Sequence, residues 1–252
     1  MSRKAWKSKT SVDTSTRRVL PFFALSKRLG TARGLVVQTS AKVNLTLEVL
    51  RKREDGYHEL ATILQSVDLW DRLAVEPADS LSLVTSDPAL PTDEGNLVMR
   101  AARLLRDPAA VDRGARLRLD KRIPVAAGLG GGSSDAAAAL WALNRMWGIR
   151  WRVKRLQELA ERLGMDVPFS LGKGGVVATG RGERLAPLPA TGGLGLVLVN
   201  PNFPLSTKEV YHRVPAGWSQ EATGTGRMIA ALRSRSPRQI AAALTNNLQA
   251  VV

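Results

Sequence analysis

The stretch PVAAGLGGGSSDAAAALWALNRMWG, residues 124–148, decides the fold because a glycine-rich loop runs directly into an alanine-rich helix. Glycine tolerates positive φ and lets a ligand approach the backbone closely, so several N–H groups can point into one concavity. Ser133 or Ser134 is a good N-cap, and a helix N-terminus attracts anions. The stretch predicts a phosphate-binding loop, and its glycines are Gly128, Gly130, Gly131 and Gly132.

Two familiar phosphate motifs do not fit this loop. A P-loop needs Gly-Lys-Ser/Thr after its spacer, and no lysine follows these glycines. The dinucleotide fingerprint needs a preceding strand inside a βαβ unit, which the surrounding sequence does not show. On the loop alone, a glycine-rich connection without a ligand stays open as the alternative.

Composition excludes several classes of site. The chain has 252 residues, 44% of them hydrophobic, and no apolar run reaches the length of about 20 residues that spans a bilayer. It has no cysteine, which rules out disulfides, thiolate metal sites and a cysteine nucleophile. Its two histidines, His58 and His212, disfavour a histidine-rich metal site. We expect a cytoplasmic protein without membrane segments.

The net charge of +15 is unevenly spread. Residues 1–34 carry nine Lys/Arg and one acid, Asp13, and therefore +8 of that charge. They predict a basic disordered leader; a transit peptide, which would imply a plastid, and an over-extended start both stay open. The remaining +7 is scattered over residues 35–252, which favours a solvated surface and an anionic small substrate over a nucleic-acid groove.

Strand and helix patterns interleave without a regular βαβ period, which predicts an α+β fold. Alternation in KVNLTLEVL predicts a strand, and Asp55-Gly56 predicts a turn into HELATILQSVDL. Gly148 and Gly164 are plausible helix ends. The further elements we expect are helices over 94–107 and 153–163 and strands over 115–123, 174–180 and 194–200.

Several motifs together resemble the GHMP kinases, the superfamily of galactokinase, homoserine kinase, mevalonate kinase and phosphomevalonate kinase. The loop itself resembles their phosphate-binding motif. Among the families of this group, the sequence is most similar to the kinases of 4-diphosphocytidyl-2-C-methylerythritol. The matching motifs, in order and at similar intervals, are AKVNLTLEV (41–49), REDGYHEL (53–60), LGMDVPFSLGKG (163–174) and GRGE (180–183).

The resemblance implies a GHMP kinase fold. Its N-terminal domain, over residues 35–188, would be like ribosomal protein S5 domain 2. Residues 189–252 would form a ferredoxin-like C-terminal domain that looks truncated, because the family's second glycine-rich loop is not seen near the end of the chain. The active cleft is expected between the two.

The resemblance also implies transfer of the γ-phosphoryl group of ATP to a hydroxyl of that substrate, in non-mevalonate isoprenoid precursor synthesis. Asp166 would be the base, although an Asx-turn is the alternative on sequence alone. Lys42 and Asn44, two apart on a strand, share one face. Lys42 would lie near the transferred phosphate, and Asn44 would hold a substrate hydroxyl.

Further residues carry over from the family motifs. Tyr57 and Tyr211 would stack on the two faces of cytosine, and His58 would bind its ring edge. Lys173 would touch the diphosphate. Asn96 would lie near the nucleotide base. ATP implies Mg²⁺, whose nearest candidates are Ser133, Ser134 and Asp135, and no dedicated metal cage is expected.

Two other functions stay open. One is a sister GHMP kinase, acting on homoserine or phosphomevalonate. The other is an RNA-binding protein of S5-like fold, suggested by the basic leader. The expected partner is the small cytidyl diphosphate substrate, without nucleic acid or membrane, in a monomer or homodimer.

Overall fold

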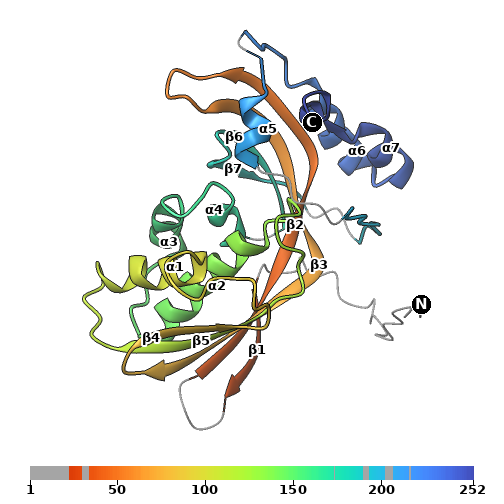
Figure 1. Cartoon of the computed structure of the whole chain (residues 1–252). Coiled ribbons are helices and arrows are strands. Elements are labelled where there is room, and N and C mark those ends of the chain that lie inside the picture. The colour runs from red at the N-terminus through yellow and green to blue at the C-terminus, as the bar shows by residue number, and fades with distance from the viewer. Residues whose placement is uncertain (1–22, 30–33, 173, 190–192, 202–206, 216) are drawn as a thin grey trace, which may run out of the picture.

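The computed structural model describes residues 23–29, 34–172, 174–189, 193–201, 207–215 and 217–252, in which one mixed sheet is covered by helices (Figure 1). The sheet strands are β1 Phe23–Leu29, β2 Gly34–Lys52, β3 His58–Ala78, β4 Leu81–Thr85, β5 Gly114–Asp120, β6 Gly175–Gly180, β7 Arg184–Pro187 and β8 Thr245–Asn246. The helices are α1 Leu97–Arg106, α2 Gly131–Met146, α3 Val153–Ala160, α4 Val167–Ser170, α5 Thr207–His212, α6 Thr223–Ser234, α7 Pro237–Ala243 and the 3-10 helix Asn247–Ala250.

The strands β2 and β3 form an antiparallel hairpin that runs through the whole sheet. They are 19 and 21 residues long, whereas strands of about 5–6 residues are usual. One half of β3 pairs with β5 and the other half pairs with β6. The main strand order is β1-β2-β3-β5-β4. In addition, β7 pairs with β6, and β8 pairs in parallel with β2.

The two largest hydrophobic cores lie along this hairpin. In the larger one, α1 and α2 pack on β2, β3, β5 and β4 (Figure 1). The alanine run Ala136–Ala139 is fully buried there, and its short side chains let α2 approach the sheet closely. In the second core, α6 and α7 pack through Met228, Leu232 and Ile240 on Leu45 and Ile63 of the hairpin.

Most of the predicted elements are confirmed. The helix predicted over 94–107 spans 97–106, and the alanine-rich helix spans 131–146. The strands predicted over 115–123 and 174–180 span 114–120 and 175–180, and the turn at Asp55-Gly56 forms. The helix predicted over 153–163 ends at Ala160, and turns follow it. None of the described helices is long and apolar enough to cross a membrane.

Two predictions differ from the structure. Phe23–Leu29, within the predicted disordered leader, forms β1, because the edge of β2 offers its backbone groups for antiparallel pairing; residues 1–22 lie outside the described residues. The segment 194–200, predicted as a strand, is not one, and Val197 and Val199 are 91% and 86% exposed. Its pattern has no strand to pair with among the residues that the structure describes. The domain division at residue 188 stays a prediction.

Candidate active site

The glycine loop enters α2 through left-handed backbone. Gly128 and Gly130 have φ of 71° and 68°, and Gly130 is the N-cap of α2. The predicted cap at Ser133 or Ser134 is wrong, because the entry turn needs a positive φ that serine rarely adopts. Both serines lie in the first turn, where the Ser134 hydroxyl donates to the carbonyl of Gly131 at 2.9 Å.

The loop lines a hollow of about 320 Å³ together with the N-terminus of α1. Asn96 lines this hollow, and its side chain is already engaged; its place near the nucleotide base stays a prediction. Its Oδ1 accepts from the N–H of Val98 at 3.0 Å, and its Nδ2 donates to the carbonyl of Pro91 at 2.9 Å. Asn96 therefore caps α1 and shapes the wall of the hollow.

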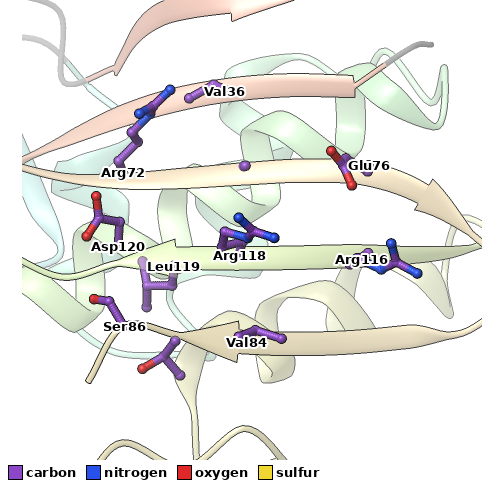
Figure 2. A pocket seen from close by; sticks show the side chains of 11 residues that line it. Val36, Arg72, Glu76, Val84, Ser86, Arg116, Arg118, Leu119 and Asp120 are labelled. Carbon is purple, nitrogen blue, oxygen red and sulfur yellow. The ribbon is translucent and has the colours of Figure 1, made fainter. Parts of the chain in front are cut away.

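A larger hollow, of about 600 Å³, lies on the sheet face opposite the helices (Figure 2). Arginines and acids line it, and none of the residues predicted for the site is among them. Its position on an open, polar sheet face is ordinary for antiparallel sheets. We therefore place the candidate active site at the glycine loop.

Lys42 of β2 joins the loop to a carboxylate. Its Nζ lies 3.4 Å from Oδ2 of Asp166 and donates to Oδ1 of Asn44 at 2.8 Å. The Nδ2 of Asn44 in turn donates to Oγ1 of Thr62 at 2.8 Å. This chain of hydrogen bonds confirms that Lys42 and Asn44 share one strand face, and it fixes the ammonium group in place.

The loop rests directly on Lys42. The backbone N–H of Lys42 donates to the carbonyl of Leu129 at 2.9 Å. A Cβ on Gly130 would lie 2.8 Å from Cγ of Lys42, so only glycine fits there. The structure thus brings together Asp166, Lys42 and the glycine loop, three features separated by up to 124 residues in the sequence.

The carboxylate of Asp166 is accessible from solvent. It is the N-cap residue of α4 by position, but its side chain makes no capping hydrogen bond, so the Asx-turn alternative is not what the structure has. Its side chain is 39% exposed, next to a Lys42 side chain that is 10% exposed. A ligand in the site can therefore reach this carboxylate from solvent.

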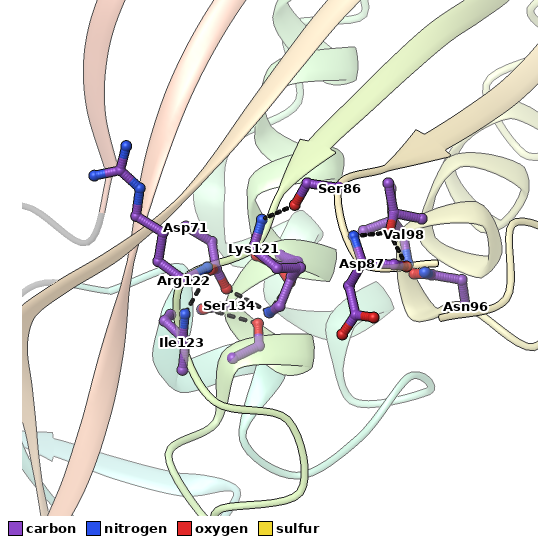
Figure 3. Close-up of polar contacts among 12 residues, drawn as sticks. Asp71, Ser86, Asp87, Asn96, Val98, Lys121, Arg122, Ile123 and Ser134 are labelled. Carbon is purple, nitrogen blue, oxygen red and sulfur yellow. Dashed lines mark hydrogen bonds and ion pairs between the residues drawn. The ribbon is translucent and has the colours of Figure 1, made fainter. Parts of the chain in front are cut away.

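A buried ion cluster beneath the loop was not found from the sequence (Figure 3). The Nζ of Lys121 contacts Oδ2 of Asp71 and lies 2.8 Å from Oδ2 of Asp135. Asp71 also accepts from the backbone N–H of Ile123 at 2.9 Å. Because a Cβ on Gly131 would lie 3.0 Å from Nζ of Lys121, the cluster supports the start of α2 from below.

Burial and neighbouring charges act in opposite directions on the pKa values in this cluster. Burial raises the pKa of Asp135 to about 7, although the charge of Lys121 opposes this shift. Burial also works to lower the pKa of Lys121, but the charges of Asp135 and Asp71 raise it. Oδ1 of Asp135 is buried without a hydrogen-bond partner among the described residues. Two sequence features could have pointed to this cluster: Asp71 lies in a largely apolar strand segment, and Asp135 directly precedes the alanine run.

An aromatic pair lies at the hairpin end of the site. The rings of His58 and Tyr211 are 5.5 Å apart and tilted by 44°. Burial raises the pKa of Tyr211 to about 12, and the charge of Asp166 adds to this. Burial lowers the pKa of His58, as do the charges of Lys52 and His212. Nε2 of His58 is buried and has no hydrogen-bond partner within the described ranges.

Tyr57 is arranged differently. Its ring lies under the guanidinium of Arg181, with Cζ 4.9 Å from the ring centroid. The clamp of Tyr57 and Tyr211 on one base stays a prediction. Lys173 lies outside the described residues.

Comparison with known proteins gives the same family. The family model of the GHMP kinases N terminal domain matches residues 96–174. The 4-diphosphocytidyl-2-C-methyl-D-erythritol kinase of Pelotomaculum thermopropionicum is 51% identical over 213 residues, which cover 84% of this chain and 74% of that protein. The enzyme of the same name from Caldanaerobacter subterraneus is 41% identical and is covered to 75%.

The chain belongs to the 4-diphosphocytidyl-2-C-methyl-D-erythritol kinase family. A crystal structure of 4-(cytidine 5'-diphospho)-2C-methyl-D-erythritol kinase superposes with a TM-score of 0.67 at 38% identity, covering 86% of this chain and 76% of that one. Homoserine kinase from Cytophaga hutchinsonii, with a TM-score of 0.62 at 20% identity, shares the fold. The predicted α+β GHMP kinase fold is confirmed.

Proposed function

We propose that this chain transfers the γ-phosphoryl group of ATP to the 2-hydroxyl of 4-diphosphocytidyl-2-C-methylerythritol. The observation that carries this proposal is the meeting of Lys42, Asp166 and the glycine loop in one site. Phosphoryl transfer needs a positioned hydroxyl, a proton acceptor and positive charge around the transferred group. The family supplies the substrate, since its members are kinases of this cytidyl diphosphate.

Asp166 accepts the proton of the substrate hydroxyl as its oxygen attacks the γ-phosphorus of ATP, while the bond from that phosphorus to the β-phosphate oxygen breaks and ADP leaves. Its exposed carboxylate fits this role, because a general base must come within hydrogen-bond reach of the proton that it takes. Lys42, 3.4 Å away, brings its ammonium to the place where negative charge is transferred. Asn44 and Thr62 hold that ammonium rigid, and a pre-oriented charge is more effective than one that must reorganise.

The glycine loop binds the phosphates of ATP. The left-handed residues Gly128 and Gly130 line the hollow, and the N-terminus of α2, which begins there, offers its backbone donors to an anion. Mg²⁺ bound to ATP neutralises phosphate charge, and usually keeps several waters and few protein ligands. The described residues include no cluster of three or more acids or histidines for a metal. Of the predicted candidates to reach it, Ser133 lines the hollow, whereas the hydroxyl of Ser134 is bonded to the carbonyl of Gly131 and Asp135 is paired with Lys121 in the buried cluster.

His58 and Tyr211 face the cytidyl part of the substrate. The unpartnered Nε2 of His58 offers a hydrogen bond to a ring edge, and Tyr211, whose ring lies 5.5 Å from that of His58, adds an aromatic face. A buried polar atom without a partner costs roughly 1–3 kcal/mol. A base that satisfies Nε2 therefore recovers binding free energy that a mismatched base does not.

The test is a phosphorylation assay with ATP and three acceptors: the cytidyl substrate, homoserine and phosphomevalonate. We expect a phosphorylated product, identified by mass spectrometry, from the cytidyl substrate alone. Turnover of homoserine or phosphomevalonate in its place would favour a sister kinase. Salt-sensitive RNA binding that survives deletion of residues 1–34, without any kinase activity, would favour the RNA-binding alternative.

A further inference from the structure

The turn between β6 and β7, GRGE at residues 180–183, is built to present one side chain. Gly180 and Gly182 have φ of 73° and 110°, conformations that other residues rarely adopt. The carboxylate of Glu183 folds back and accepts from the backbone N–H of Arg181 at 2.6 Å. A Cβ on Gly180 would lie 2.6 Å from that carboxylate, so the glycine makes room for it.

Arg181, held by this turn, covers a face of Tyr57. Its guanidinium carbon lies 4.9 Å from the ring centroid, within the range of a cation–π contact. Tyr57 follows the hairpin turn and is 52% exposed, so a ligand can reach its ring from solvent. Two opposite charges lie near Arg181: Asp55 on the hairpin and Glu183 on its own turn.

The turn also lies against the catalytic segment. Gly180 pairs with Leu60 of β3, two residues after His58, and Gly182 faces Met165, the neighbour of Asp166. Arg181 thus comes from a point between the hairpin tip and the catalytic carboxylate. A residue at this point can set the position of the aromatic ring relative to the reacting groups.

We infer that Arg181 is a positioning residue: its guanidinium backs the ring of Tyr57, so that the other face forms a fixed platform for the base of the nucleoside-diphosphate substrate. The inference rests on the proposed function. It assigns a purpose to the GRGE turn that phosphoryl transfer itself does not require. Fixing a platform in advance improves binding, because less conformational freedom is lost when the base stacks.

The test measures the dissociation constant of the cytidyl diphosphate substrate by titration calorimetry, which needs no turnover. Arg181→Ala should weaken this binding about two- to fivefold, the usual effect of an exposed cation–π contact. The Michaelis constant for ATP should not change. Arg181→Lys should recover part of the loss, since an ammonium is also attracted to the ring. Arg184→Ala, whose side chain is 70% exposed, is the matched control and should bind like the parent.

A double-mutant cycle separates backing from direct contact. If Arg181 acts through the ring, Arg181→Ala should add nothing to Tyr57→Ala. An unchanged or tighter dissociation constant in Arg181→Ala would overturn the inference, as would a full additional loss in the Tyr57→Ala background. If the parent protein binds the substrate without phosphorylating it, the proposed function is wrong. The calorimetric comparison of Arg181→Ala with the parent would then still test the role of Arg181 in binding. Parent protein that does not bind the substrate would overturn both.

Discussion

Replacing Gly130 with alanine should disable catalysis while leaving the fold intact. The new Cβ would meet Cγ of Lys42 at 2.8 Å, whereas ordinary contact begins at 3.4 Å. Lys42 must therefore retreat by the difference, about 0.6 Å. Its Nζ lies 3.4 Å from Asp166 and is tied to Asn44, so this shift disturbs both contacts. A misplacement of about 1 Å in a reacting group can cost roughly 100-fold in rate, and we expect kcat to fall about 10- to 100-fold.

The stability cost of the same variant is separate and smaller. A non-glycine residue in left-handed backbone costs about 1–2 kcal/mol, which lowers the melting temperature by roughly 2–8 °C for a chain of this size. Gly148→Ala is the matched control, because Gly148 has φ of 75° and nothing within 4 Å of its would-be Cβ. It should show a similar loss of melting temperature at the parent kcat. Equal losses of kcat in both variants would refute the role assigned to the Gly130–Lys42 contact.

Three other predictions concern the base, the cytidyl site and the ion cluster. Asp166→Asn should reduce kcat by about 10²–10⁴-fold, the usual worth of a general base, while calorimetry still detects substrate binding; near-parent turnover would remove Asp166 from the mechanism. Tyr211→Ala should raise the Michaelis constant for the cytidyl substrate but not for ATP, and His58→Ala should erode the preference for cytidine over uridine analogues; unchanged constants in both variants would argue against a cytidyl site here. Because burial raises the pKa of Asp135 to about 7, the folded protein keeps a proton that the unfolded chain loses near pH 4, so this group's stabilisation is complete below about pH 4 and is lost as pH rises toward about 7. Denaturant titrations between about pH 4 and about pH 7 should show a smaller fall in the free energy of unfolding for Asp135→Asn than for the parent. The same dependence on pH in both proteins would contradict the raised pKa of Asp135.

The sequence predicted the residues that depend on local geometry. The glycine loop and its alanine helix are contiguous, and Lys42 and Asn44 are two apart on one strand, so periodicity alone places them. The predicted N-cap of α2 was wrong by three or four residues. Serine is a favoured N-cap residue, and only the backbone shows that the entry to the helix needs a positive φ. Local rules thus found the loop and misjudged its last turn.

The ion cluster could not be predicted from the same rules. Asp71 and Lys121 are 50 residues apart, and their meeting depends on the register in which Arg72 pairs with Asp120. The link between Tyr57 and Arg181 likewise depends on β6 joining β3. Each of these contacts follows from strand pairing over long separations, which no single segment encodes.

The long hairpin of β2 and β3 gives the chain an order of assembly. Its strands are joined by residues 53–57 alone, so the ribbon can close locally with a small loss of chain entropy. The partners of β3 arrive from much later in the chain, as in the pairing of Leu64 with Val176, and such distant contacts slow folding. Both cores then condense on the same ribbon, and Lys42 lies on it between Val37 of one core and Leu45 of the other. Lys42 is held within the ribbon by Asn44 and Thr62 and is covered by the glycine loop of the larger core, so partial unfolding of that core should expose it.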